Sequence, residues 1–227
     1  MSARLSIERL QVSYRHSAVD APVLRDLHLE VGAGEAVGIC GVSGSGKTTL
    51  ARAILRLLPA SAAVMGRVEF DGQELLEQPA EQLRRLRGRR ISLISQEPSA
   101  CLNPFARALA QVEEVVRAHG AAGDARAVLR RFFDGDAERI ANAYPHELSG
   151  GERQRLVICQ AMVCGPALLI ADEPTVALDS VAQKAFLDLL RELRETTGLS
   201  LLLVSHNRAA LRYVTDRSLE LREGQLR

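Results

Sequence analysis

The chain has 227 residues, of which 47% are hydrophobic and 25% are charged, and its formal net charge is +1. Such a chain can bury a sizeable core as one domain, or as one domain with lobes. A net charge this close to zero argues against electrostatic binding of nucleic acid, which needs a basic excess or a strongly basic face. No apolar stretch approaches the ~18 residues typical of a membrane span, and the chain does not open with a signal-peptide core. We therefore expect a cytoplasmic protein.

Three segments in the first third of the chain predict antiparallel strands. Residues 5–14, 23–31 and 66–70 show alternation or a β-rich composition, and breaks that contain glycine follow the second and third of them. Alternating segments separated by such breaks are typical of strands joined by tight turns.

Between these segments lies a phosphate-binding pattern. The apolar run 36–40 precedes Gly41-Val-Ser-Gly-Ser-Gly-Lys-Thr48, and a helical pattern follows it. This is the strand, loop and helix order in which the pattern G-x-x-x-x-G-K-[ST] binds phosphate through backbone N–H groups. Lys47 would reach the β- and γ-phosphates, Thr48 would offer its hydroxyl to Mg²⁺, and Thr49 would help to hold the phosphates. The alternative is a glycine-rich turn that ends in a lysine. The helical pattern has Leu50, Ile54, Leu55 and Leu58 on one face, and we expect Pro59 to end it.

The middle of the chain contains a basic run and a helical region. The run at 84–90 has five arginines, which predict a solvated helix face and turn, with contact to acidic lipid or to a partner as the other interpretation. From about 106 to 142 the pattern is helical, with glycine breaks at 120 and 123. We expect a small helical lobe there.

Two short apolar runs later in the chain, 168–171 and 201–204, predict strands buried on both faces. The helical pattern at 182–193 lies between them, so we expect a parallel crossover. Asp172 and Glu173 follow the first run, at the edge of a parallel sheet where ligands bind. Asp172 would hold Mg²⁺ directly or through water, and Glu173 would orient or deprotonate the attacking water. The alternative is a solvated strand end.

Further motifs occur in a fixed order along the chain. They are Gln96 after the apolar run 91–95, Leu148-Ser149-Gly150-Gly151-Glu152, Ala177-Leu178-Asp179, and His206 after the last apolar run. Together with the phosphate-binding pattern, they resemble the nucleotide-binding subunits of ABC transporters along nearly the whole chain.

The resemblance implies an α/β fold of the P-loop NTPase, ABC type, with a mostly parallel core sheet flanked by helices, an antiparallel β subdomain and a small helical subdomain. It implies one ATPase domain over 1–227, with 1–96 and 148–227 as the nucleotide-binding core and 97–147 as the helical lobe. The cofactors would be ATP and Mg²⁺.

The resemblance also assigns roles to single residues. It implies catalytic roles for Glu173, His206, Gln96 and Lys47. It implies ATP contacts by Tyr14, which would stack on adenine, and by Gly41, Ser43, Gly44, Ser45, Gly46, Lys47, Thr48, Thr49, Gln96, Ser149, Gly150, Gly151 and Asp179. It implies Mg²⁺ ligation by Thr48, Gln96 and Asp172. In this family Ser149 and Gly151 meet ATP held by an opposite subunit, so a second ATPase chain, the same or different, would complete each site.

Within the family, four sequence motifs resemble those of the ATPases of dipeptide, oligopeptide and nickel importers. They are Ser95-Gln-Glu-Pro98, Leu102-Asn103-Pro104, Tyr144-Pro-His-Glu-Leu-Ser149 and Ile170-Ala-Asp-Glu-Pro-Thr175. They imply a peripheral protein on the cytoplasmic face of the membrane, with permease partners, indirectly a solute-binding protein, and no nucleic acid. Departures include Val42 where Glu is commoner, Asn207 where Asp is commoner, and the absence of a further carboxyl-terminal segment. A non-transport member of the superfamily, serving DNA repair or translation, is the alternative.

Overall fold

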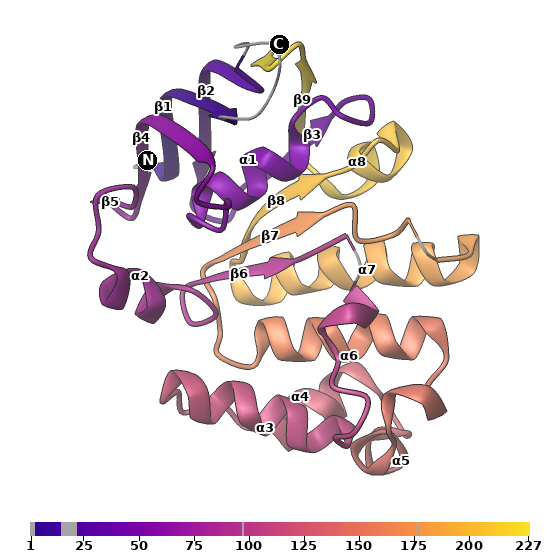
Figure 1. Cartoon of the computed structure of the whole chain (residues 1–227). Helices are drawn as coiled ribbons and strands as arrows, with labels where there is room; N and C mark the ends of the chain where they lie inside the picture. The colour runs from indigo at the N-terminus through magenta and orange to yellow at the C-terminus, as the bar shows by residue number, and fades with distance from the viewer. Residues whose placement is uncertain (1–2, 15–21, 97, 177) are drawn as a thin grey trace.

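Two β-sheets organise the residues that the computed structural model describes, which are 3–14, 22–96, 98–176 and 178–227 (Figure 1). The first is four-stranded and antiparallel, in the order β2-β1-β4-β5. Its strands are β1 (Ala3–Tyr14), β2 (Leu24–Gly32), β4 (Ala62–Phe70) and β5 (Gln73–Glu74). The antiparallel strands predicted from alternation are therefore confirmed, with β4 beginning four residues before the predicted 66–70.

The second sheet has six strands in the order β10-β9-β3-β8-β7-β6, all parallel to their neighbours except β10. Its strands are β3 (Ala36–Cys40), β6 (Ile91–Ile94), β7 (Leu168–Asp172), β8 (Ser200–Val204), β9 (Arg217–Arg222) and β10 (Gln225–Leu226). Every residue of β3, β7 and β8 is buried, which for β7 and β8 confirms the burial on both faces predicted from their continuous apolar runs. Their carboxyl ends lie at one edge of the sheet. The phosphate loop follows β3 there, Glu173 follows β7, and His206 lies two residues after the end of β8.

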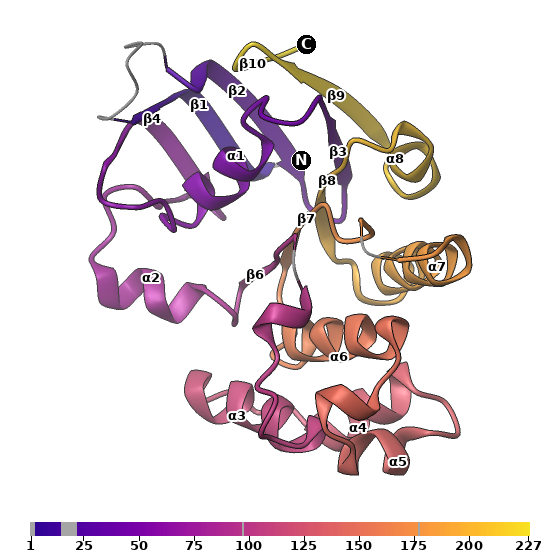
Figure 2. The same cartoon turned by 45° about the vertical axis from the view of Figure 1, so that its right-hand side comes forward.

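Helices cover both faces of this sheet (Figure 2). The helices within the described ranges are α1 (Lys47–Ile54), α2 (Ala80–Leu86), α3 (Ala108–His119), α4 (Ala125–Phe132), α5 (Ala137–Asn142), α6 (Gly150–Met162), α7 (Ser180–Thr197) and α8 (Arg208–Val214), with short 3-10 turns at Pro98–Cys101 and Pro145–Glu147. Helix α1 shares one core with the antiparallel sheet and one face of the parallel sheet. On the opposite face α6, α7 and α8 share a second core with α3, α4 and α5. No helix within the described ranges is both long enough and apolar enough to cross a membrane.

The first helix after the phosphate loop ends earlier than the sequence indicates. It stops at Ile54 rather than at Pro59, because Arg56 adopts a left-handed conformation with φ 50°. The guanidinium of Arg87 donates to the carbonyl of Leu55 at 2.9 Å and to that of Arg56 at 3.0 Å, which satisfies carbonyls left over at the helix end. One arginine of the basic run, Arg87, is thus a half-buried helix cap, which corrects the expectation of a solvated helix face and turn at this position; the other four are exposed.

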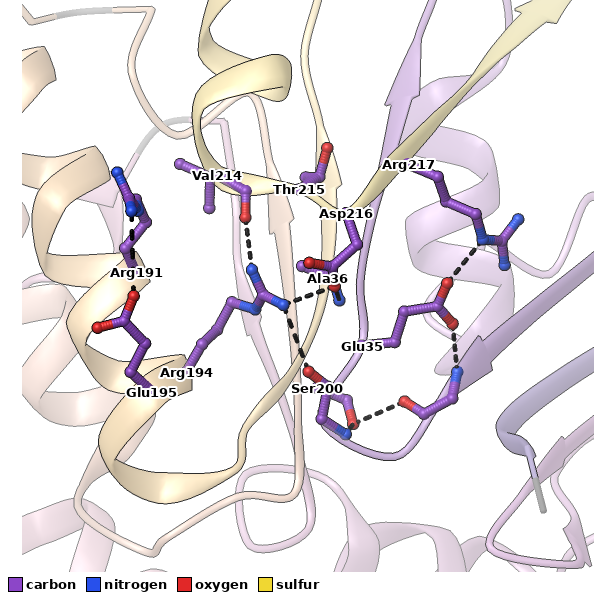
Figure 3. Close-up of polar contacts among 12 residues, drawn as sticks. Glu35, Ala36, Arg191, Arg194, Glu195, Ser200, Val214, Thr215, Asp216 and Arg217 are labelled. Atoms are coloured by element: carbon purple, nitrogen blue, oxygen red, sulfur yellow. Dashed lines mark hydrogen bonds and ion pairs between the residues drawn. The ribbon is translucent and has the colours of Figure 1, made fainter. Parts of the chain in front are cut away.

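At the sheet edge far from the phosphate loop, a polar cluster joins α7 to the first residues of β3 and β9 (Figure 3). Arg194 of α7 donates to the carbonyl of Val214 at 2.7 Å and to the carboxylate of Asp216 at 2.6 Å. The same carboxylate oxygen of Asp216 accepts from the amide of Ala36 at 2.8 Å. This cluster holds the strand that leads into the phosphate loop against the end of α7.

Candidate functional site

The backbone of residues 41–46 can be built only with glycine at particular positions. A Cβ at Gly41 would lie 2.6 Å from the hydroxyl of Ser45 and 2.7 Å from the carbonyl oxygen of Leu221. Gly46 has φ 104°, and a Cβ there would lie 2.8 Å from a methyl group of Leu24. These contacts explain the two glycines that bound the pattern, because a side chain at either would force the loop open. The loop can therefore curl tightly in front of α1.

Lys47 is held at the mouth of this loop. Its side chain is 7% exposed, and its ammonium donates to the carbonyl oxygens of Gly41 at 2.8 Å and Val42 at 3.0 Å. A buried ammonium needs such partners, since its desolvation is costly. The ammonium also lies 3.6 Å from the carboxylate of Glu173. This places one cation and one carboxylate together at the carboxyl ends of β3 and β7.

Two buried oxygens beside the loop have no hydrogen-bond partner among the residues that the structure describes. They are the hydroxyl of Ser45 and Oδ1 of Asp172, a residue that is 3% exposed. Burial raises the pKa of Asp172, although a hydrogen bond with Thr48 opposes the shift. A buried carboxylate oxygen without a donor, next to a threonine hydroxyl, is an arrangement of oxygens suited to Mg²⁺. The predicted Mg²⁺ ligands Thr48 and Asp172 therefore fit that ion.

Among residues 3–14, 22–96, 98–176 and 178–227, the structure has no group of three or more His, Cys, Asp or Glu side chains that could hold a metal ion. Phosphate oxygens of a nucleotide would have to supply further ligands. Metal and nucleotide would then bind together.

Glu173 and His206 form a pair on adjacent strand ends. Oε1 of Glu173 accepts from the backbone amide of His206 at 2.9 Å, and Oε2 lies 2.9 Å from Nδ1 of the same histidine. Glu173 is 7% exposed and has φ 49°, a left-handed conformation that non-glycine residues rarely adopt. Such strain persists only where the surroundings hold it, and it is common at functional sites.

The predicted catalytic residues and most of the predicted phosphate-loop residues, but not Gly41 or Ser45, border one cavity of about 600 Å³. It is lined by Tyr14, Val23, Val42, Ser43, Gly44, Gly46, Lys47, Thr48, Thr49, Gln96, Glu173, Val176 and His206. Tyr14 stands at its edge, with its hydroxyl 3.5 Å from that of Thr49. The apolar lining by Val23, Val42 and Val176 did not follow from the sequence, because single valines in loops carry no signal of their own.

The residues 149–151 lie elsewhere. Ser149 and Gly151 line a separate cavity of about 190 Å³, which shares no residue with the first. Ser149 caps α6 in a reciprocal arrangement, since its hydroxyl accepts from the amide of Glu152 at 3.2 Å and its amide donates to the Glu152 carboxylate at 2.7 Å. Arg139 also bonds to that carboxylate. Within one chain, the two halves of the predicted ATP site are therefore apart.

Gly150, which lies between Ser149 and Gly151 in the chain, is exposed, and a Cβ there would meet nothing within 4 Å. Asp179 serves as the cap of α7, with its carboxylate accepting from the amides of Val181 and Ala182 at 2.9 Å each. Two residues of the predicted family motifs, Glu97 and Ala177, lie outside the described residues.

Comparison with known proteins gives matches along nearly the whole chain. A family model described as ABC transporter matches residues 24–176. The oligopeptide transport ATP-binding protein OppD of Escherichia coli (strain K12) is 37% identical over 229 residues, covering 98% of this chain and 68% of that protein. The ABC transporter ATP-binding protein YejF of the same strain is 39% identical over 229 residues, covering 97% of this chain. The chain spans only 43% of the length of YejF.

Among solved structures, a similar one is the ATP-binding cassette MJ0796, described as a dimer in a post-hydrolysis state bound to ADP and Pi. It superimposes with a TM-score of 0.83 at 28% identity, covering 98% of this chain and 96% of that chain.

Proposed function

The chain belongs to the ABC transporter family, and from this premise we propose that it is the ATP-binding and ATP-hydrolysing subunit of an importer. The ABC-type P-loop fold predicted from the sequence is confirmed by the solved relative. The observation that carries the proposed activity is the meeting of Lys47, Glu173 and His206 in one cavity beside the phosphate loop. These groups are a cation for phosphate, a carboxylate for water and a histidine paired with that carboxylate.

We propose that ATP binds with its phosphates against the amides of 41–48 and the ammonium of Lys47. Gln96, at the rim of the cavity, would contact the γ-phosphate and the ion. Thr48 and Asp172 would hold Mg²⁺, and when bound the ion would neutralise phosphate charge. Glu173 would orient the attacking water and accept its proton, while His206 would keep the Glu173 carboxylate in place and contact the γ-phosphate. Tyr14 would stack on adenine.

Two chains would be needed for each complete site. Because Ser149 and Gly151 lie away from the chain's own cavity, we propose that they meet ATP held by a second ATPase subunit, with Gly150 beside them. The amides at the start of α6 and the positive end of its dipole favour such an anion. Asp179, in the loop before α7, would lie at the same interface. Hydrolysis would remove the charge that joins the two chains and let them separate.

The cargo and the other partners belong to the same proposal. The relatives named above are transport proteins, and OppD is an oligopeptide transport protein by name. This supports peptide import over a role in DNA repair or translation. Permeases would be the direct partners, a solute-binding protein an indirect one, and the cytoplasmic face of the membrane the location. Nickel transport stays a prediction.

We also propose one ATPase domain, with 1–96 and 148–227 as the nucleotide-binding core and 97–147 as its helical lobe. In support, α3, α4 and α5 pack against one another, and both α3 and α4 pack on α6. The lobe would thus move together with α6, the helix that Ser149 caps.

Glu173→Gln tests this function. The amide keeps the shape of the side chain but cannot accept the proton of water, so we expect ATP binding to persist and turnover to fall by about 10²-fold or more. Under saturating MgATP the variant should elute as a dimer on gel filtration, while the nucleotide-free protein should not. A monomer under these conditions, or wild-type turnover, would contradict the proposal. In cells, the variant should fail to restore uptake of labelled oligopeptide to a strain that lacks the chain.

A further inference from the structure

The turn that carries Glu173 is tied to the helix that begins after Ser149 by one buried side chain. Gln154, in the second turn of α6, is 5% exposed, and its Nε2 donates to the carbonyl oxygen of Pro174 at 2.7 Å. Both groups are buried in this contact. Gln154 does not line the cavity that contains Lys47 and Glu173, so its connection to that cavity runs through Pro174.

Pro174 is a sensitive point in this turn. Proline has no N–H group, so its carbonyl is the only backbone group with which it can form hydrogen bonds. The preceding residue, Glu173, has φ 49°, and a residue before proline ordinarily prefers an extended conformation. Glu173 is fixed on its amino side, where its amide donates to the carbonyl of Val204 at 2.9 Å. Gln154 supplies the corresponding bond just beyond its carboxyl side.

Helix α6 connects this bond to the first turn of the helix. Gly150 and Gln154 are four positions apart and Gly151 and Gln154 three, so they share one helix face. The capping arrangement of Ser149 and Glu152 keeps the first turn regular. A rigid helix that shifts at its amino end therefore carries Gln154, and with it the Pro174 carbonyl, in the same direction.

We infer that Gln154 is a positioning residue for hydrolysis. It holds the Pro174 carbonyl, and thereby the Glu173 carboxylate, in register with the helix whose first turn meets the second subunit's ATP. This inference rests on the proposed function, because it takes Ser149 to contact ATP across the interface. It adds a link between the two sites, since contact of α6 with one ATP sets the geometry of the carboxylate that acts on the other.

The first test is Gln154→Leu, which keeps the approximate size of the side chain but removes the donor. We expect kcat to fall by about 10- to 100-fold, the loss that a small misplacement of a catalytic group can cause. The KM for ATP should stay within about twofold, because Gln154 does not border the cavity that contains Lys47, although it does line the cavity of Ser149 and Gly151. The matched control is Gln160→Leu on the same helix, a partly exposed position away from the turn, which should keep wild-type kinetics.

The second test is Gln154→Glu, which separates positioning from simple packing. A protonated carboxyl can donate to the Pro174 carbonyl, whereas an ionised one cannot and is repelled by it. Burial will raise the pKa of the introduced carboxyl, so the ratio of its kcat to that of the wild type should rise as the pH falls. The same ratio for Gln154→Leu should not change with pH.

Two results would overturn the inference: wild-type kcat in Gln154→Leu, or a pH profile of Gln154→Glu that parallels the wild type. Dimer formation by Glu173→Gln is measured in parallel. If that variant forms its ATP-dependent dimer while Gln154→Leu is fully active, only the role of Gln154 fails. If it does not dimerise, the proposed function itself fails.

Discussion

At the scale of single residues, the two lysines of the chain, Lys47 and Lys184, differ in burial and in hydrogen-bond partners. Lys47 is 7% exposed and bonded to loop carbonyls that a nucleotide would replace as partners. Lys184 is exposed and pairs with Asp188 at 2.7 Å on the surface of α7. The same residue type therefore has a buried position beside the cavity and a solvated position far along the chain.

We predict that Lys47→Ala lowers kcat by about 10²- to 10³-fold, because the transition state loses a preorganised cation. Lys184→Ala should leave turnover unchanged, since this lysine pairs with Asp188 on the exposed surface of α7 and does not line the cavity with Lys47. Steady-state phosphate release measures both. Wild-type turnover in Lys47→Ala would contradict the assignment of this lysine to the γ-phosphate.

At the scale of elements, the cluster at the far edge of the parallel sheet joins α7 to β3 and β9 (Figure 3). Arg194→Met would remove the guanidinium donor from the Val214 carbonyl and from the Asp216 carboxylate, which would keep its bond with the Ala36 amide. We predict a loss of about 1–3 kcal/mol in the free energy of unfolding, as expected when a partly buried hydrogen-bonded group is removed. Activity per folded molecule should change little, because the cluster lies away from the cavity.

Arg191→Met is the matched control. This arginine lies one turn before Arg194 on the same helix, its side chain is 46% exposed, and its nitrogen is 4.0 Å from the Glu195 carboxylate. Its loss should change stability by less than about 0.5 kcal/mol. Equal destabilisation of the two variants in urea unfolding would show that the cluster does not hold the elements together.

The cluster also has a pH dependence. Burial opposes ionisation of Asp216, but the amide of Ala36 and the guanidinium of Arg194 outweigh it and lower the pKa below the usual 3.8. Because the pKa is lower in the folded state, this stabilisation is present above about pH 4 and is lost as the pH falls through the folded value. Thermal melts from pH 6 to pH 3 should therefore show a shallower loss of stability in Arg194→Met than in the wild type.

At the scale of the whole molecule, the first and second cavities are halves of different sites under the proposed function. Ser149→Arg should keep MgATP binding by its own phosphate loop, because the cavity with Lys47 shares no residue with that of Ser149. It should lose most hydrolysis, because Ser149 would no longer contact the ATP held by the second chain. Nucleotide binding and phosphate release are measured separately. Lost binding in this variant would mean that Ser149 acts within its own chain.

Mixing Ser149→Arg with Lys47→Ala extends this prediction. In a hybrid dimer the intact phosphate loop of the first chain faces the intact residues 149–151 of the second. Hydrolysis by the mixture should therefore exceed the sum of the two separate variants. A simple sum would contradict a site shared between two identical chains.

The parts of this protein that sequence alone determined are those with local causes. The phosphate loop needs glycine at 41 and 46 and lysine at 47 in one stretch. The strands at 36–40, 168–171 and 201–204 are recognisable in the sequence as apolar runs, and the structure shows them buried. Strand β9 was not predicted from the sequence, because its residues are mostly exposed or half-buried and form no apolar run. It joins the parallel strands through its pairing with β3.

Tertiary structure alone decided the contacts between residues far apart in the chain. The early end of α1 depends on Arg87, and the position of Glu173 depends on Gln154, His206 and Val204. Neither periodicity nor composition marks such partners, because each contact exists only after parallel strands bring their ends to one edge. The same topology that assembles Lys47 and Glu173 in one cavity keeps Ser149 out of it, which is why the fold, and not the motif, makes a second chain necessary under the proposed mechanism.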